Sequence, residues 1–139
     1  MNRKIFETII SRIPHLTADG LMDISKPEFA MKRRDFVRAA KHLNQAIAAS
    51  KYLQNIGKSS RFSRWQRSNC THQRLKELVE WSAGQEISEG AFIAAALHAG
   101  FTMGVQDGTV AYFNFLVPQM EYELNQFNKV RELRKVVGA

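Results

Sequence analysis

The sequence predicts a mainly helical α+β fold, in which four longer helices surround a small two-stranded antiparallel hairpin. One segment begins at a good N-cap, Ser88, is apolar on every side and ends at Gly100, as expected of a buried helix. Residues 101–115 then alternate apolar with small or polar side chains on either side of a Gln-Asp-Gly-Thr turn, which is typical of a hairpin. We therefore expect residues 86–116 to form the core that the other helices cover.

The first element in the chain is predicted to be a short amphipathic helix over residues 2–13. Its isoleucines and Phe6 recur at helical spacing, and Pro14 disfavours helical geometry in the residue before it. Residues 15–24 mix Asp, Gly and Thr with leucine and methionine. This stretch predicts an irregular connector with one helical turn at most.

A long helix is predicted to start at Ser25 and to extend as far as Ile56. Ser25 is followed by Pro27 and Glu28, a capping-box pattern in which the serine caps the helix. Apolar residues then recur on one face, and the opposite face is cationic. The cationic residues that we expect on this face are Arg34, Arg38 and Lys41.

The segment 58–70 is polar, serine-rich and basic, and it carries the most suggestive local pattern in the chain. Three arginines spaced three residues apart alternate with two aromatic residues. Guanidinium groups pair with phosphates and aromatic rings stack on unpaired bases, so this pattern predicts contacts with nucleic acid. The alternative is that the aromatic side chains anchor the loop to the core while the arginines face solvent. The residues concerned are Lys58, Arg61, Phe62, Arg64, Trp65 and Arg67.

The C-terminal half is predicted to have the order of a winged helix-turn-helix. A helix over residues 71–83 ends at Gly84, and the buried helix and the hairpin described above follow it. The second helix offers few of the Arg, Asn, Gln or Lys side chains that read base edges, so it is poorly suited to a major groove. A last helix, from Pro118 to about Val137, is predicted to close the core.

Composition predicts a single domain that spans residues 1–139. Hydrophobic residues make up 45% of the chain, which is enough for a core, and the one cysteine, Cys70, excludes an intrachain disulfide. No signal peptide or membrane-spanning stretch is recognisable, so we expect a cytoplasmic location and no membrane partner. Within the domain we distinguish four segments, at residues 1–24, 25–70, 71–117 and 118–139.

The formal net charge of +7 is unevenly distributed along the chain. Residues 26–76 contain thirteen Lys or Arg and two acids, a net charge of +11, whereas residues 77–128 contain seven acids and no Lys or Arg, a net charge of −7. Such an asymmetry predicts a polyanion-binding surface or an acidic protein partner. The alternative is that the two halves neutralise each other within the fold.

Two short stretches, ISEGAFIAAALHAGF at residues 87–101 and AYFNF at residues 111–115, carry a resemblance to other proteins. Together they resemble a pattern found in short uncharacterised proteins of bacterial phages, plasmids and integrative elements. The resemblance assigns no reaction or ligand to any residue. It implies the context of a mobile element, in which DNA-handling proteins and inhibitors of host defence, such as anti-CRISPR proteins, are common.

Catalytic and metal-binding patterns are not recognisable in this sequence. The four histidines are isolated, and the pair Cys70 and His72 lacks further ligands nearby. We therefore expect a non-enzymatic accessory protein of a mobile element, without a cofactor, that binds nucleic acid or a nucleoprotein mostly through phosphate contacts. The alternative is a protein that binds and inhibits a host defence complex, as anti-CRISPR proteins do. The sequence does not predict the oligomeric state.

Overall fold

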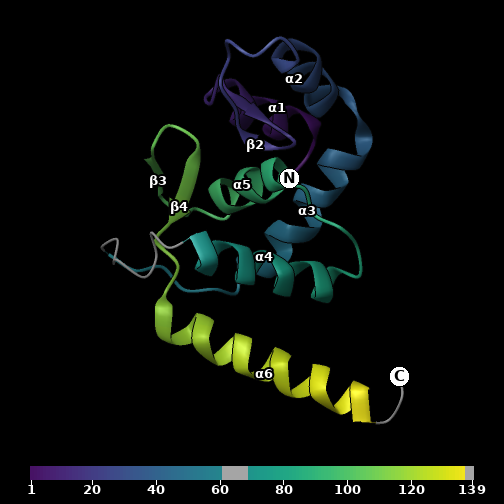
Figure 1. The fold of residues 1–139 in the computed structure, drawn as a ribbon, viewed down its shortest axis with the longest axis vertical. Coiled ribbons are helices and arrows are strands. Elements are labelled where there is room, and N and C mark those ends of the chain that lie inside the picture. Colours follow the sequence, from purple (N-terminus) through teal and green to yellow (C-terminus); the bar gives the residue numbers. More distant parts are fainter. Residues whose placement is uncertain (61–68, 137–139) are drawn as a thin grey trace.

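Helices predominate in the computed structural model, which describes residues 1–60 and 69–136 (Figure 1). The described residues form six helices and two small antiparallel hairpins, which confirms the predicted α+β class with a majority of helix. None of these helices is both long and apolar enough to cross a lipid bilayer. In chain order the elements are α1 (Arg3–Ser11), β1 (Leu16–Thr17), β2 (Gly20–Leu21), α2 (Phe29–Arg38), α3 (Ala40–Leu53), α4 (Asn69–Ala83), α5 (Glu89–His98), β3 (Met103–Gln106), β4 (Val110–Phe113) and α6 (Val117–Val136).

Helix α5 is the central element, and the local signals that predict it are the ones that form it. The Ser88 side chain accepts a hydrogen bond from the backbone N–H of Ala91 at 3.2 Å, and Gly100 takes a positive φ of 94° after the last turn. All side chains from 91 to 96 are buried. In Figure 1, α5 lies between the N-terminal elements and α4, with α3 alongside it.

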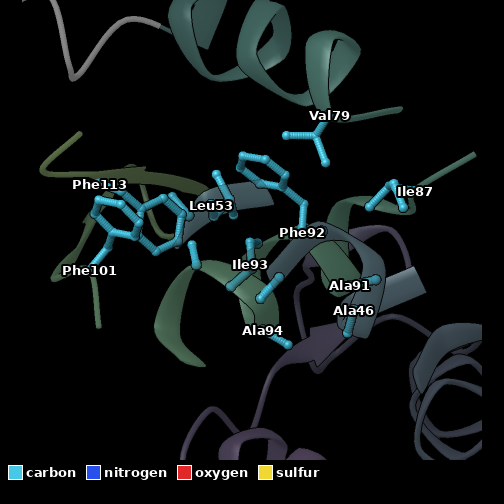
Figure 2. Close-up of a cluster of buried hydrophobic side chains, with 14 of the residues drawn as sticks. Ala46, Leu53, Val79, Ile87, Ala91, Phe92, Ile93, Ala94, Phe101 and Phe113 are labelled. Carbon is cyan, nitrogen blue, oxygen red and sulfur yellow. The ribbon is translucent and has the colours of Figure 1, made fainter. Parts of the chain in front are cut away.

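Helices α3 and α5 form the most extensive contact between helices, and they do so through small side chains. Ala46 and Ala49 of α3 are fully buried, as are Ala91 and Ala94 of α5 (Figure 2). Small side chains at a helix crossing allow the two axes to approach closely. The resulting pair of helices is the frame on which the other elements pack.

The predicted hairpin is confirmed as β3 and β4, and aromatic rings in and beside its strands pack on one another and on Phe92 of α5. Its strands pair Met103 with Phe113, and the turn uses positive φ values at Asp107 and Gly108, as a tight hairpin turn requires. Ring centroids of Phe101 and Phe115 lie 4.7 Å apart, and those of Phe113 and Phe115 lie 5.5 Å apart. These rings close one end of the core.

The single helix predicted from Ser25 to Ile56 is wrong, because two helices stand in its place. Helix α2 begins at Phe29 rather than at Ser25, whose backbone N–H and hydroxyl both donate to the Asp23 carboxylate, at 2.9 and 2.8 Å. The serine of the capping-box pattern is therefore engaged in a turn before the helix. Helix α2 ends at Arg38, and Ala39 has an extended backbone, with φ −68° and ψ 126°, before α3 begins.

The break at Ala39 lets the two helices bury different faces. Phe36 of α2 is fully buried against Phe6 of α1, with ring centroids 5.5 Å apart. In an uninterrupted helix, Ala46 would lie about 80° from Phe36 around the axis, so the two could not both point squarely into the core. Leu43 and Ile47, which a continuous apolar face would include, are only half-buried, and the buried face of α3 consists of His42, Ala46, Ala49, Ser50 and Leu53.

The connector predicted as irregular contains a second hairpin, β1 and β2, which lies on α5. Leu16 pairs with Leu21, and both side chains are buried. The backbone N–H of Gly90 in α5 donates to the carbonyl of Ala18 in the hairpin turn at 3.1 Å. Two-residue strands are too short to give an alternating pattern, which is why this hairpin is not predictable from the sequence.

Helix α6 covers α4 along only part of its length. Phe127 is buried against Trp81 of α4, with ring centroids 5.1 Å apart. Tyr122 and Leu133, by contrast, are 61% and 63% exposed. The prediction that the last helix closes the core is therefore confirmed at Phe127 but not at Leu133, because the C-terminal part of α6 extends past α4 (Figure 1).

Candidate nucleic-acid interface

Three of the predicted cationic residues are exposed around the break between α2 and α3. Arg34 and Arg38 lie one turn apart on α2, and Lys41 lies in the first turn of α3. Within the described part of the chain, none of these three side chains takes part in a hydrogen bond or an ion pair. Their charges are therefore available to a ligand.

The arginine and aromatic residues predicted to contact nucleic acid, Arg61, Phe62, Arg64, Trp65 and Arg67, lie outside the described residues. The stacking and the anchoring interpretations of this loop both stay predictions. Lys58, which precedes the loop, is exposed and pairs with Phe115 in an isolated β-bridge. Its Nζ atom lies 5.0 Å from the centroid of the Phe101 ring, a cation–π contact.

Several other cations of the basic segment serve the fold, so part of its charge is neutralised internally. The Arg33 guanidinium donates to the carbonyls of Ile10, Ile13 and Leu16 at 2.9, 2.7 and 2.9 Å, and burial lowers its pKa. Lys32 forms an ion pair with Asp19, and Lys76 lies 3.5 Å from Glu80. Arg34, Arg38, Lys41 and Lys58 remain exposed, as do Lys26, Lys51 and Arg74 of the same basic segment.

A groove runs along one side of α3, from Asn44 to Asn55, between Lys41 and Lys58 in the chain. Lys41, Asn44, Ala48, Lys51 and Asn55 follow one another at intervals of three and four residues, so they share one face of the helix. The groove beside them has a volume of about 490 Å³, and Ser82, Ala83 and Gln85 form its opposite wall. Among the described residues, no acidic side chain lines it.

Tyr52 forms part of the floor of this groove and is held in place by a carboxylate behind it. Its hydroxyl donates to Glu123 of α6 at 3.3 Å. Burial, and then the charge of Glu123, raise the pKa of the Tyr52 hydroxyl well above its ordinary value. The floor is thus uncharged at neutral pH.

The geometry separates the predicted residues into two groups. Arg34 and Arg38 on α2 lie before the start of α3, and Lys41 lies in its first turn, whereas Lys58 lies beyond its end; α3 itself is about 20 Å long at 1.5 Å per residue. Lys51 and the two asparagines bridge this distance, and none of them was singled out from the sequence. The interval of three and four residues from Lys41 to Asn55 was the signal that could have identified them.

Helix α5, which occupies the position of a recognition helix in the winged-helix order, is buried by α3, α1 and the first hairpin. Its contact with DNA is therefore excluded, in agreement with its poor supply of base-reading side chains. The order of α4, α5, β3 and β4 is winged-helix-like. The helix face with which such domains contact DNA is, in α5, buried in the core.

One serine–histidine pair joins α3 to α5. The hydroxyl of Ser50 lies 2.7 Å from Nδ1 of His98, and Ser50 is buried. Because the Ser50 side chain is buried and the bond joins two packed helices, the pair serves as an interhelical hydrogen bond. Burial, and then the amino terminus of Met1, lower the pKa of His98.

The lowered pKa of His98 predicts that the protein becomes less stable as the pH is lowered. The unfolded chain takes up a proton at the ordinary value of about 6.5, before the folded chain does, so the free energy of unfolding should decrease as the pH falls below about 6.5. In His98→Asn, the amide oxygen can accept the Ser50 hydrogen bond but does not titrate, and this dependence should flatten. Urea unfolding of both proteins between pH 5 and 8 measures it, and identical pH profiles would contradict the assignment to His98.

Within residues 1–60 and 69–136, no three His, Cys, Asp or Glu side chains converge as a metal site would require. No protein-family model matches the chain, and no match was found among the curated proteins or the solved structures with which it was compared. The resemblance to proteins of mobile elements therefore stays a prediction, and the candidate interface rests on the geometry of α3 and its neighbours.

Proposed function

We propose that this protein is a non-enzymatic nucleic-acid-binding protein that holds a single strand, free or within a nucleoprotein, along the exposed side of α3. The observation that carries the proposal is the groove of about 490 Å³ beside α3, which has lysines along and beyond its length and no acidic lining among the described residues. Asn, Gln, Ser and Lys are side chains that commonly contact phosphate and sugar oxygens. A strand lying in this groove meets donors from α3 and from its opposite wall, and no carboxylate among the described residues lines the groove.

The side chains that line the groove also determine the kind of binding. Contacts to phosphate carry no sequence information, so the strand is bound with little sequence preference along the groove. Arg34 and Arg38 extend the positive surface beyond the Lys41 end, and Lys58 leads to the arginine-containing segment at the other end. Binding of this kind releases counterions and is therefore strongly salt-dependent.

Reversing the charge along α3 should flatten the salt dependence of binding. In the triple variant Lys41→Glu, Lys51→Glu and Lys58→Glu, the slope of log K against log salt should fall by about 2, because each single-strand phosphate contact contributes about 0.7. The measurement is fluorescence anisotropy of a labelled random-sequence DNA or RNA oligonucleotide across a salt titration.

The matched control reverses three exposed cations that lie outside the groove, Lys4, Arg12 and Lys129. It changes the net charge by the same amount, so it separates contact in the groove from attraction to the whole protein. Equal losses in the two triple variants would contradict the placement of the strand. Absence of binding by the parent protein at low salt would reject the function itself.

The second candidate function is binding to a protein of a host defence complex. The observation that favours it is the exposed apolar part of α6, where Tyr122 and Leu133 are 61% and 63% exposed, together with the partly exposed Trp81 of α4, on which Phe127 packs. Apolar and aromatic side chains of this kind provide the anchors of protein interfaces. If this function holds, Leu133→Asp should abolish capture of a host protein in a pull-down, and oligonucleotide binding should be absent.

A further inference from the structure

A second cleft, of about 470 Å³, adjoins the start of α3. Its walls come from the turn between β1 and β2, from α3, from α4 and from the residues that lead into α5. The cleft and the groove along α3 are neighbours, because Gln85 lines the groove and the next residue, Glu86, lines the cleft. Lys41, at one end of the basic stripe of α3, also lines the cleft.

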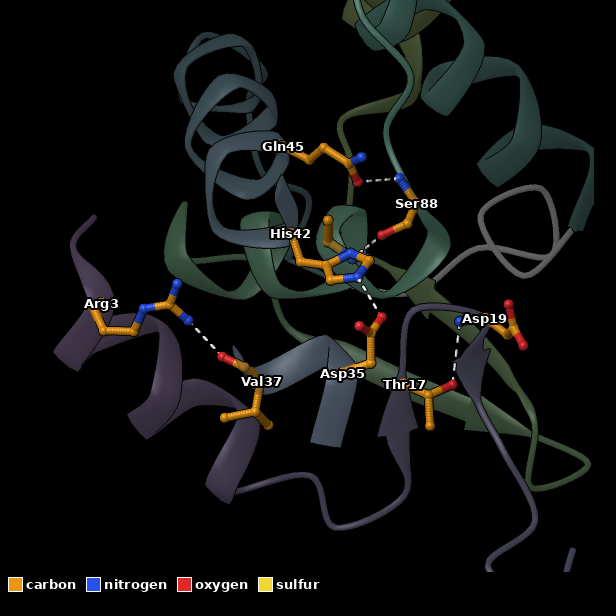
Figure 3. Close-up of polar contacts among 9 residues, drawn as sticks. Arg3, Thr17, Asp19, Asp35, Val37, His42, Gln45 and Ser88 are labelled. Atoms are coloured by element: carbon orange, nitrogen blue, oxygen red, sulfur yellow. Dashed lines mark hydrogen bonds and ion pairs between the residues drawn. The ribbon is translucent and has the colours of Figure 1, made fainter. Parts of the chain in front are cut away.

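His42 forms part of the wall of this cleft and is only 4% exposed. Figure 3 shows its ring turned toward the Asp35 side chain. Its Nε2 atom lies 3.2 Å from the Asp35 carboxylate, so the neutral ring carries its proton there and leaves a lone pair on Nδ1. The Phe36 ring packs edge-on at 5.2 Å and fixes the orientation of the imidazole. In the described part of the chain, Nδ1 is buried without a hydrogen-bond partner.

The start of α5 does not offer its backbone N–H groups to a ligand. Ser88 N–H donates to Gln45 at 2.9 Å, Gly90 N–H donates to Ala18, and Ala91 N–H donates to the Ser88 hydroxyl. The anion site that a helix N-terminus can form is thus already occupied by the protein's own acceptors. These three N–H groups are therefore not available to a phosphate.

The cleft instead presents acceptors. The carboxylates of Asp19, Glu86 and Glu89 line it together with His42, whose Nδ1 atom has no partner among the described residues. Lys41 and Lys76 line the cleft as well, but Lys76 pairs with Glu80, and Asp19 pairs with Lys32. The acceptors repel a phosphate, but they accept hydrogen bonds from N–H donors, and carboxylates pair with the amino groups of bases. The fitting ligand is uncharged, carries N–H donors and fills a site at the small end of the range for ligand pockets.

We propose that this cleft takes up one unpaired nucleobase with an exocyclic amino group from the strand bound along α3. This inference rests on the proposed function, because the strand brings the base to the cleft. The phosphate stays outside at Lys41, where the stripe of α3 and the cleft meet. The amino group donates to the acceptors inside, so cytosine, adenine or guanine is preferred over uracil or thymine.

The test compares three labelled ten-residue DNA strands by fluorescence anisotropy: oligo-dC, oligo-dU and a strand of abasic sites. Cytosine and uracil have the same ring, and they differ at C4 in the amino group and at N3 in the proton. Oligo-dC should bind about fivefold more tightly, or better, than oligo-dU and than the abasic strand. The ratio of the two dissociation constants is the readout, because it cancels effects on phosphate binding.

Two variants assign the preference to the cleft. In Glu86→Gln, which changes an exposed side chain, and in His42→Gln, the ratio should fall towards one, whereas the control Glu132→Gln on α6 should keep it. If all three strands bind equally, or if both cleft variants keep the ratio, the inference is overturned while the proposed function stands. If no strand binds at all, the proposed function fails and the inference falls with it.

Discussion

Replacing Ala95 with arginine should unfold the protein or leave it barely stable. Ala95 is fully buried in α5, the helix that α3, α1 and the hairpins cover. A guanidinium there has no room and no counterion, and an unpaired buried charge costs several kcal/mol against a total stability of about 5 to 15 kcal/mol. We expect loss of the cooperative unfolding transition, measured by circular dichroism during urea or thermal denaturation.

An exposed alanine provides the matched control for this substitution. Ala30 lies on α2 and faces solvent, so Ala30→Arg should change the free energy of unfolding by no more than about 0.5 kcal/mol. If Ala95→Arg melted within a few degrees of the parent, this face of α5 would be accessible in solution. Helix α5 could then act as a recognition helix, as the second helix does in winged-helix domains.

The parts of the fold that were predictable from the sequence are those in which local signals decide the structure. The cap at Ser88, the apolar run after it, the stop at Gly100 and the turn at Asp107 and Gly108 each act within a few residues. They specify α5 and the second hairpin without reference to the rest of the chain. These two elements are therefore the ones whose start, stop and turn residues are clearest in the sequence.

The break at Ala39 was not predictable, because nothing local requires it. Residues 30–49 contain neither glycine nor proline, and their helical propensity favours a continuous helix. The break arises from contacts at long range, in which Phe36 packs on α1 and Arg33 binds three carbonyls at the end of that helix and beyond it. Tertiary packing of this kind overrides propensity.

The candidate site was predictable in composition but not in layout. Arg34, Arg38 and Lys41 were identified by charge, and all three are exposed. The wall formed by Ser82 and Gln85 depends on how α4 and its connector lie beside α3, which periodicity cannot show. The same holds for His42, whose burial follows from the rotation of α3 after the break.

Gly90→Ala should destabilise the protein by about 2 kcal/mol or more, although alanine is the better helix former. An added Cβ would lie 2.0 Å from the carbonyl oxygen of Thr17 and 3.0 Å from the Phe36 ring. The oxygen belongs to the backbone of the first hairpin and cannot rotate away. Overpacking typically costs 1 to 3 kcal/mol and occasionally more, whereas the gain in helix propensity is only about 1 kcal/mol.

A second glycine tests whether the nature of the obstructing atom decides the effect. At Gly104 an added Cβ would meet the side chain of Tyr112, at 2.3 Å, and that ring can shift without moving the backbone. Gly104→Ala should therefore lose less stability than Gly90→Ala in matched urea titrations.

Because Gly90 sits where α5, the first hairpin and α2 meet, its substitution should also widen the neighbouring cleft that His42 lines and reduce the preference for oligo-dC. A Gly90→Ala protein as stable as the parent would show that α5 and the first hairpin are not in close contact in solution.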